Sequence, residues 1–446
     1  MRRILLFPVR ILWRVGSRVA SVVILPFSAV VWIMRLIPHI PKMANADEVI
    51  LMTRPTGFGH SVTGPDAMRR LYRGKRCLFF LASWLYEHNQ KVSLLWPDID
   101  VVFIPRFIAG TPYQNRIVAI PFLRWHDAMA IILTRGMVAV MSRGRAHFQT
   151  LYEMYLSMQK LSSNPKYLTE EYKDHADGVE ALFQCQILQK NVPCLPLRLP
   201  QRFRDEFNSR LDQAWTAGGY TTPRKTCCLY VRYEERDSHY VMLRNSSSLE
   251  NHLPAVRLLN NAGYQVLLTG DFKIEGATKK ACAGELVNAE VLGVESDLFQ
   301  LFAASEADLF IGNHGGGDGV SLVNGIPSLY IDWFPYSQGR RNAWFYHKLA
   351  RDENGEMIPG KRLITDLIHD TKASFGTLVN NTPEEIADAV ACFIEDVKTP
   401  GAPDPYADVA ALIPKDTNFY AIGARLSPAW VRRNILSEGE LASSVT

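Results

Sequence analysis

Several short motifs that mark common enzyme sites are missing from this sequence. There is no HExxH pattern of a zinc protease, no GxxxxGK[ST] phosphate loop and no GxSxG nucleophile turn. No Cys and His residues pair at metal-ligand spacing. The sequence therefore predicts no resident metal and no cofactor, and it does not point to any of those three enzyme classes.

Cysteines are few, and none forms a CxxC pair. The chain has seven: Cys77, Cys185, Cys194, Cys227, Cys228, Cys282 and Cys392. The number is odd, the spacing is scattered and several lie in apolar runs. This pattern predicts reduced, buried cysteines rather than a disulfide framework or a zinc site.

Acidic residues are missing from the first 42 positions. That segment holds seven basic residues: Arg2, Arg3, Arg10, Arg14, Arg18, Arg35 and Lys42. Because the whole chain carries a net charge of +4, the other 404 residues together carry −3. The body of the protein is nearly neutral, so we expect no nucleic-acid partner.

An uncharged, mostly apolar run lies between Arg18 and Arg35. It covers residues 19–34 and contains Pro26, whereas a spanning helix needs about 20 apolar residues. We expect residues 1–42 to form a membrane anchor. Four interpretations stay open: an interfacial or re-entrant helix, a single span, a secretory signal that lacks a cleavage site, and a segment of the protein core.

The segment before this run is amphipathic. Its apolar residues Leu5, Val9, Leu12 and Trp13 fall on one helical face, and Arg3, Arg10, Arg14 and Arg18 fall on another. Basic residues of this kind favour an anionic membrane surface as partner. We therefore expect the protein at the cytoplasmic face of the cell inner membrane.

Strands alternate with helices in both halves of the chain. Apolar runs predict strands at 49–52, 77–81, 101–104, 227–232, 266–269 and 307–311. This alternation predicts an α/β protein with two doubly wound, Rossmann-like domains that face a cleft. After the anchor we expect domains at 43–220 and 221–398, and a tail at 399–446 that could cross back to the first domain.

The most informative stretch is residues 308–333, DLFIGNHGGGDGVSLVNGIPSLYIDW. It predicts a strand, a Gly-rich turn, a short helix and a second strand. The turn contains Asn313, Gly315, Gly316, Gly317 and Asp318. Its glycines can bring backbone N–H groups to one point, and the helix directs its positive end there, which favours a phosphate. A plain strand-to-helix turn explains the same residues.

Further polar residues stand at predicted strand ends or before helices: His60, Arg232, Arg244, Asn245, Gly270 and Asp271. The two arginines could grip a diphosphate, and Asn245 or Asp271 could bind a sugar or ribose hydroxyl. Ion pairing with neighbouring glutamates, helix capping and turn closure are the competing explanations. His60 ends the loop GFGH at 57–60 and offers an acid/base group near neutral pH; the alternative is a surface turn.

Taken in order, these motifs resemble the C-terminal domain of a bacterial family of glycosyltransferases of the GT-B fold. The match covers roughly residues 225–335, with YVR at 230–232, RN at 244–245, GD at 270–271 and DW at 332–333 around the Gly-rich loop. TPEEI at 382–386 agrees with the family's closing helix, and GFGH looks like its RIGH-type loop. Three residues depart from the family pattern: Tyr230 replaces a His, His314 replaces Thr or Ser, and Asp332 replaces Asn.

The resemblance implies a nucleotide-sugar donor in the second domain and a glycan or lipid-linked acceptor in the first. It implies that Arg232, Arg244, Asn245, Gly270 and Asp271 hold the donor while the 313–319 loop cradles its diphosphate. Transfer would be metal-independent, with His60 as the candidate base. Two alternatives remain: a sugar-nucleotide 2-epimerase, although Asp318-Gly319-Val320 stands where its paired Glu is usual, and a non-catalytic membrane-bound scaffold.

Overall fold

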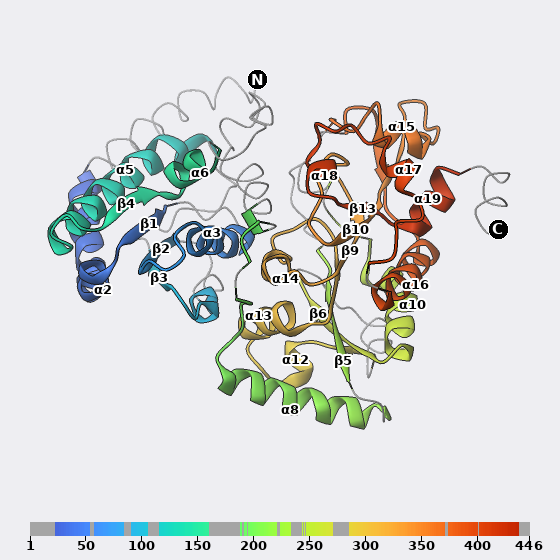
Figure 1. The fold of residues 1–446 in the computed structure, drawn as a ribbon, viewed down its shortest axis with the longest axis horizontal. Coiled ribbons are helices and arrows are strands. Elements are labelled where there is room, and N and C mark those ends of the chain that lie inside the picture. The colour runs from blue at the N-terminus through green and yellow to red at the C-terminus, as the bar shows by residue number, and fades with distance from the viewer. Residues whose placement is uncertain are drawn as a thin grey trace, which may run out of the picture. The chain divides into compact units, whose positions relative to one another are not determined.

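The computed structural model describes residues 23–53, 58–83, 91–105, 116–159, 188–189, 191–193, 195–220, 224–232, 243, 245, 247–270, 285–370, 373–399 and 401–436. The chain divides into two compact units, Met1–Pro193 and Cys194–Thr446 (Figure 1). Each unit has its own parallel β-sheet, which confirms the predicted α/β class with two Rossmann-like domains. The cleft between them stays a prediction.

The first unit is built on a four-stranded sheet in the order β3-β2-β1-β4. Its strands are β1 (Glu48–Met52), β2 (Cys77–Ser83), β3 (Asp100–Pro105) and β4 (His147–Thr150). All neighbours are parallel. Every residue of β1 is buried, as expected for a strand covered on both faces.

Helices cover the two faces of this sheet, and alternate residues of β2 show which helix covers which face. Leu78 and Phe80 belong to a core cluster with the helix Val23–Asn45 and with α5 (Arg116–Met141). Phe79 points to the other face, where α3 (Phe58–Leu71) and α6 (Leu151–Gln159) lie. There Gly64 of α3 approaches so closely that an added Cβ would lie 3.1 Å from the Phe79 ring.

The helix Val23–Asn45 contains a 3-10 turn, η1 (Ile37–His39), and ends with α2 (Ile40–Asn45). Among the described residues it is the one helix with the length and apolar composition to cross a membrane. A core helix or a signal sequence would pass the same test. Packing of its inner side against the sheet makes it a layer of the first unit, whereas the sequence predicted an anchor separate from that domain.

The second unit is built on a seven-stranded sheet in the order β13-β10-β9-β8-β5-β6-β7. Its strands are β5 (Lys225–Tyr230), β6 (Tyr264–Thr269), β7 (Leu286–Val287), β8 (Leu309–Gly312), β9 (Ser328–Trp333), β10 (Ala343–His347) and β13 (Arg425–Leu426). The chain builds outward from β5 to β7, then returns to β5 and builds the other way from β8. The carboxyl ends of β5 and β8 therefore form a topological switch point, where ligands bind in open α/β sheets.

The helices of the second unit are α8 (Gln201–Ala217), α10 (Leu249–Asn261), α12 (Ala289–Leu292), α13 (Ser296–Glu306), α14 (Gly319–Asn324), α15 (Gly360–Ile364), α16 (Pro383–Lys398), α17 (Ala407–Ala410), α18 (Asn418–Ala421) and α19 (Pro428–Asn434). A two-stranded antiparallel sheet joins β11 (Leu349–Arg351) to β12 (Thr377–Val379). The predicted start of α16 is confirmed. Thr382 is the N-cap residue, Pro383 is the first residue of the helix, and Thr382 and Glu385 form a capping box.

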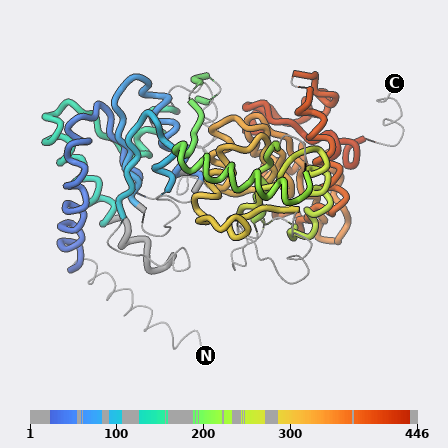
Figure 2. Tube along the Cα trace, turned by 90° about the horizontal axis from the view of Figure 1, so that it is seen from below, coloured from blue at the N-terminus to red at the C-terminus, as the bar shows by residue number. Residues whose placement is uncertain are grey.

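The structure places the boundary between the units earlier than the sequence prediction of residue 220. Helix α8 lies along the second unit (Figure 2) and belongs to it. Phe207 stacks edge-on against Phe302 of α13 with ring centroids 4.9 Å apart. The Gln265 side chain of β6 donates to the Leu211 carbonyl at 3.2 Å. These contacts join α8 to the second unit.

The C-terminal tail also belongs to the second unit as far as it is described, although the sequence left open a return to the first domain. Strand β13 pairs with β10 at the edge of the sheet, where Phe345 aligns with Leu426. Helix α19 follows and buries Trp430 completely. The tail therefore supplies the last strand and an outer helix of the second unit.

Candidate functional site

The switch point of the second sheet joins two of the predicted ligand-binding segments. Arg232 follows β5, and Asn313 follows β8. The Arg232 backbone N–H donates to Asn313 Oδ1 at 3.1 Å, and Asn313 Nδ2 donates to the Arg232 carbonyl at 3.5 Å. The Arg232 guanidinium also donates to the His314 carbonyl at 3.3 Å. The buried Asn313 amide thus clamps the two strand ends together.

The Gly-rich turn lies against the ring of Tyr230, the last residue of β5. A Cβ added to Gly315 would lie 2.8 Å from this ring, and one added to Gly317 would lie 2.2 Å from it. Since real Cβ atoms do not approach so closely, glycine is required here by the tyrosine packing. Tyr230 is also one of the three residues that depart from the pattern of the resembled family, and its ring fills the space beside Gly315 and Gly317.

Gly270 ends the neighbouring strand β6 in a conformation that only glycine adopts easily. Its φ angle is +109°, and an added Cβ would lie 2.2 Å from the Val231 carbonyl oxygen. Gly270 therefore allows the chain after β6 to pass close to the chain after β5. The structure brings Gly270, Arg232 and the Gly-rich turn to one edge of the sheet.

Asp318 closes the turn and is buried in an ion pair. Its Oδ2 atom accepts from Arg340 Nε at 2.9 Å and from the Tyr330 hydroxyl at 2.9 Å. The side chains of Asp318 and Arg340 are each only 5% exposed. Burial and the nearby Asp318 carboxylate raise the pKa of Tyr330, which keeps its hydroxyl protonated as a donor. These partners give Asp318 a clear role in holding the turn.

The helix after the turn is shorter than a phosphate-binding helix usually is. Helix α14 has six residues, so few aligned peptide dipoles point at the turn. The Gly319 N–H is already bonded to the Gly316 carbonyl at 3.2 Å. The predicted contribution from the helix dipole is therefore small, and Arg232 and the amides of the turn itself are the stronger candidates for an anion.

His314 has a structural place in this turn. Its Nδ1 atom lies 2.7 Å from the Phe334 carbonyl oxygen, and the centroids of the His314 and Trp333 rings are 4.7 Å apart. The side chain is buried. His314 thus ties the Gly-rich turn to the chain that follows β9.

Asp332 near the end of β9 connects this edge to the segment that contains Asn245. Its φ angle is +53°, a left-handed conformation that Asp and Asn tolerate better than most residues. Its Oδ2 accepts from the Ser247 N–H at 2.7 Å, and its Oδ1 accepts from the Asn381 N–H at 2.6 Å. Asp meets both requirements at this position, where the resemblance led us to expect Asn.

Lys348, which follows β10, is a residue of this edge that the sequence analysis missed. It is 2% exposed, and its Nζ donates to the Asn245 carbonyl and to Asn380 Oδ1, both at 2.7 Å. Burial lowers its pKa to about 8, and the Asp332 carboxylate opposes that shift. A charged residue directly after the aromatic run AWFYH was the available signal.

Some predicted site residues lie outside the described residues. These are Arg244, Asp271 and the side chain of His60. The structure does place Phe58–His60 in the first turn of α3, where the sequence predicted a loop, and Thr63 Oγ1 donates to the Gly59 carbonyl at 3.1 Å. The role of His60 stays a prediction.

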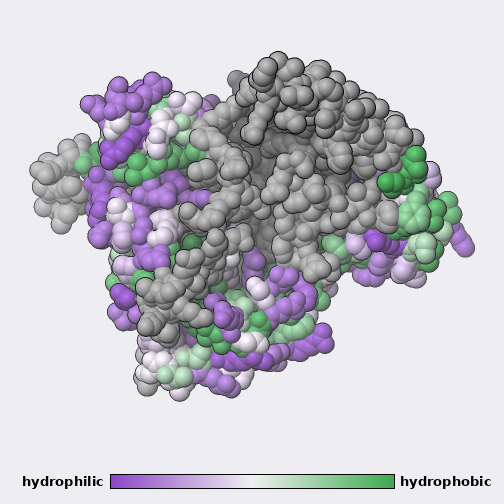
Figure 3. Space-filling model, turned by 180° about the vertical axis from the view of Figure 1, so that it is seen from behind, coloured by the Kyte–Doolittle hydropathy of each residue, from purple (hydrophilic) through white to green (hydrophobic). Residues whose placement is uncertain are grey.

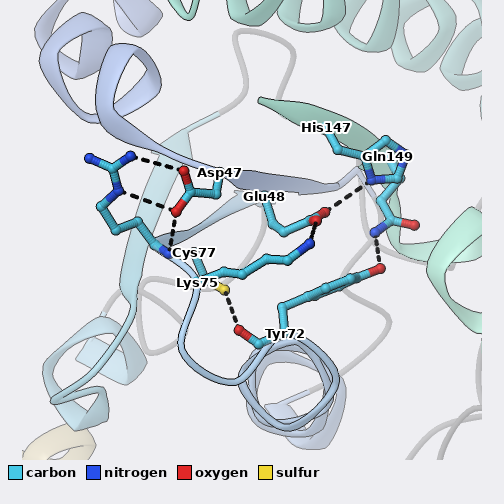
Figure 4. A network of polar contacts seen from close by, with 8 residues as sticks. Asp47, Glu48, Tyr72, Lys75, Cys77, His147 and Gln149 are labelled. Atoms are coloured by element: carbon cyan, nitrogen blue, oxygen red, sulfur yellow. Dashed lines mark hydrogen bonds and ion pairs between the residues drawn. The ribbon is translucent and has the colours of Figure 1, made fainter. Parts of the chain in front are cut away.

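A second polar cluster lies in the first unit, at the amino ends of its strands (Figure 4). Glu48 begins β1, and its buried carboxylate accepts from Lys75 Nζ at 2.5 Å and contacts His147 Nδ1 at 3.0 Å. Nearby, Asp47 pairs with Arg76 at 2.9 Å, and the hydrogen bonds from Arg76 lower the pKa of Asp47 to about 2. Ligands of parallel sheets bind at the carboxyl ends, so we assign this amino-end cluster to stability.

Metal ligation was not expected, although the chain does contain one Asp-x-Asp pattern at Asp98-Ile99-Asp100. Asp98 lies 3.4 Å from Arg69, and Asp100 lies 2.6 Å from Lys42. Within the part of the chain that the structure describes, no group of three His, Cys, Asp or Glu residues is arranged to hold a metal ion.

The described cysteines are free thiols, three of them buried: Cys77, Cys227, Cys228 and Cys392. Burial raises the pKa of Cys77 and of Cys228 to about 12. Such thiols are poor nucleophiles at neutral pH. The predicted reduced, buried state is confirmed for Cys77, Cys227 and Cys228.

No protein-family model matches the chain, and no curated protein matches it either. Solved structures with similar folds include glycosyltransferases. ADP-heptose LPS heptosyltransferase II from E. coli is 13% identical and matches 79% of this chain and 100% of its own, with a TM-score of 0.39. A UDP-glucosyltransferase from Polygonum tinctorium is 11% identical and matches 85% of this chain and 97% of its own, with a TM-score of 0.37.

A UDP-GlcNAc 2-epimerase from Neisseria meningitidis is 11% identical and matches 89% of this chain and 98% of its own, with a TM-score of 0.32. Similarities this low carry no argument about what the chain does. The fold assignment therefore rests on the strand orders of the two sheets, and the functional argument rests on the switch point of the second unit.

Proposed function

We propose that the chain is a membrane-associated glycosyltransferase that moves a sugar from a nucleotide-sugar donor to a glycan or lipid-linked acceptor. The observation that supports this most is the joining of Arg232, Gly270 and the Gly-rich turn at the switch point of the second sheet. The Arg232 guanidinium and the backbone amides of the Gly-rich turn lie at the sheet edge where open α/β sheets bind ligands. A diphosphate fits that chemistry.

At this edge, some residues contact the donor and others hold the loops in position. The Arg232 guanidinium and the amides of residues 315–317 contact the diphosphate, while Asn313, Gly270 and Asp318 hold the loops in position. Arg244 is a second contact to the diphosphate, and Asn245 and Asp271 contact the sugar or the ribose. Lys348 and Asp332 fix the segment around Asn245 through the hydrogen bonds described above.

In the transfer step, an acceptor hydroxyl oxygen attacks the anomeric carbon of the donor. The bond from that carbon to the diphosphate breaks, and the nucleoside diphosphate leaves with the electron pair. Arg232 and the backbone amides stabilise the charge that develops on this leaving group, which is the term that usually dominates such catalysis. His60 takes the proton of the acceptor hydroxyl.

The acceptor side of the reaction belongs to the first unit. That unit carries the apolar helix Val23–Asn45, preceded in sequence by five arginines, Arg2, Arg3, Arg10, Arg14 and Arg18, and no acidic residue. An acceptor close to an anionic bilayer is consistent with both features. We accordingly propose a location at the cytoplasmic face of the inner membrane.

A panel of nucleotide sugars tests the proposal with the full-length protein. One donor should raise the melting temperature and be hydrolysed slowly without acceptor. The Arg232→Gln variant should bind that donor about tenfold more weakly or worse, because it loses a charge-assisted contact. The matched control is Arg257→Gln, since Arg257 pairs with Glu285 on an exposed part of α10.

Each other outcome points to a different function. Conversion of the donor to its 2-epimer would support the epimerase and overturn the transferase. The absence of any donor-dependent shift across the panel would support the non-catalytic scaffold. Full turnover by His60→Ala, measured once an acceptor is known, would remove His60 as the base.

A further inference from the structure

The helix Val23–Asn45 has one side inside the first unit and one side on its surface. Ser28, Trp32, Leu36 and Met43 are buried. Trp32 Nε1 donates to Thr134 Oγ1 of α5 at 3.1 Å, and Ser28 Oγ lies 3.0 Å from His126 Nδ1. The inner side is thus packed and hydrogen-bonded as a core helix would be.

The other side of this helix is apolar and exposed. Its large side chains are Val23, Phe27, Val30, Met34 and Ile37, which are 71%, 58%, 54%, 62% and 52% exposed. Val30 and Met34 each follow a buried residue by two positions, which is a rotation of about 200° in a helix. They therefore point away from the sheet, and we call these five residues the outer face.

Helix α5 extends this surface. Ala130, Thr134 and Val138 are buried, whereas Ile132 and Val140 are 68% and 69% exposed. The contacts of Trp32 and Ser28 hold the two helices side by side on the same sheet face. Seen from behind, apolar side chains gather on the side of the first unit that carries these helices (Figure 3).

We infer that the outer face lies flat in the surface of an anionic bilayer and does not belong to a spanning helix. Residues 28–43 are fixed along the sheet over roughly 20 Å, so lipid cannot surround them. An exposed apolar face of this kind, next to basic residues, is the pattern of a helix that lies in the membrane interface. This deepens the proposed membrane association and is independent of the transfer reaction.

The charge of the neighbouring chain favours lipid over a second copy of the protein. All seven charged residues in positions 1–42 are basic. Lys42 pairs with Asp100, so two copies that met through this helix would bring the other twelve positive charges together, whereas an anionic bilayer would neutralise them. In sequence, Val23 directly follows the segment that holds five of these arginines, so apolar insertion and charge attraction would act on neighbouring parts of the chain.

Cosedimentation of the purified full-length protein with vesicles tests this inference. Wild type should bind vesicles that contain phosphatidylglycerol, and more weakly bind vesicles of phosphatidylcholine alone. The Phe27→Glu/Met34→Glu variant should bind about tenfold more weakly or worse, because two charges enter the inserted face. The matched control is Val291→Glu, since Val291 is 64% exposed on α12 of the second unit; it should bind as wild type does.

Three results would overturn the inference. The double variant could bind vesicles as well as wild type does, or the Val291→Glu control could lose as much binding as the double variant. Wild type could also form a dimer and bind no vesicles, with the double variant monomeric. Circular dichroism checks folding, and Phe27→Ser/Met34→Ser replaces the Glu pair if that pair does not fold. Donor-dependent melting is measured on the same samples. It should be unchanged in the double variant, which separates failure at the membrane face from failure of the proposed donor site.

Discussion

Tyr230 illustrates how one side chain sets the requirements of its neighbours. Its ring occupies the space where Cβ atoms of Gly315 and Gly317 would lie. The sequence analysis assigned these glycines to phosphate binding, which needs bare backbone. The structure adds a second reason for glycine, which is close packing against the Tyr230 ring.

Substitution of Gly317 separates the packing requirement from general glycine effects. Gly317→Ala should lower the free energy of unfolding by about 1–3 kcal/mol, because its Cβ overlaps the Tyr230 ring. Gly136→Ala on α5, where nothing lies within 4 Å of the added Cβ, should stabilise by about 0.5–1 kcal/mol. Urea unfolding measures both. Equal effects of the two substitutions would contradict the role of Tyr230.

His347 makes the stability of the second unit depend on pH. It is fully buried between Tyr336 and Trp430, with ring centroids 5.3 and 5.5 Å away. Burial lowers its pKa from 6.5 to about 3. Between pH 6.5 and 3, His347 is protonated in the unfolded chain but not in the folded chain. Its contribution to the free energy of unfolding is therefore complete above pH 6.5 and is lost progressively as the pH falls toward 3.

The His347→Phe variant should remove this part of the pH dependence. Wild type should lose up to about 1.4 kcal/mol of stability per pH unit from this one group. The variant keeps an aromatic ring in the same place, so its profile between pH 6 and 4 should be flatter. His369→Gln, at a histidine whose side chain is 58% exposed, serves as the control and should follow wild type. Parallel profiles for His347→Phe and wild type would contradict the assignment.

At the scale of the elements, the sequence predicted most strands and the start of α16 at Thr382 and Pro383, because these depend on local pattern. It did not predict that α3 begins at Phe58, since Gly57 and Gly59 favour a turn and no local signal opposes them. Lys348 was missed for a related reason: its burial depends on Asn245 and Asn380, which are distant in sequence.

The apolar run of residues 19–34 was predicted to belong to a membrane anchor, residues 1–42, because the run carries no charged residue. Its described part, from Val23 on, belongs to the helix Val23–Asn45. Only the fold separates the side that packs from the side that is exposed. Trp32→Ala should therefore lower the free energy of unfolding of the first unit by about 3–5 kcal/mol, through the cavity it leaves. Val30→Ala, at an exposed position of the same helix, should change it by less than about 0.5 kcal/mol. Chemical unfolding followed by circular dichroism compares the two variants. Similar losses of unfolding free energy would show that the helix does not pack as part of the first unit.

At the scale of the whole molecule, the strand orders of both sheets agree with the predicted doubly wound domains. The boundary between the units differed because α8 has no sequence feature that assigns it to one side. Its burial of Phe207, Leu211 and Trp215 depends on contacts with elements more than 50 residues away, such as Gln265 with Leu211.

The position of the boundary can be measured with two fragments. Residues 194–446 should fold and melt cooperatively, since they include α8 and the whole seven-stranded sheet. Residues 221–446 should aggregate or melt at a much lower temperature, because loss of α8 exposes Phe302 and its apolar surroundings. Equal melting temperatures would place the boundary where the sequence did. Donor binding by the longer fragment would further place the donor site within it.

The two ends of the seven-stranded sheet bear on how this protein avoids aggregation. The sheet terminates at β7 on one side and at β13 on the other, and each of these strands has only two residues. An edge that short leaves few unpaired backbone groups for the strand of another chain to join. The membrane location proposed above would bring copies of the protein together often. Short edge strands would then keep the sheets of neighbouring molecules from pairing with one another.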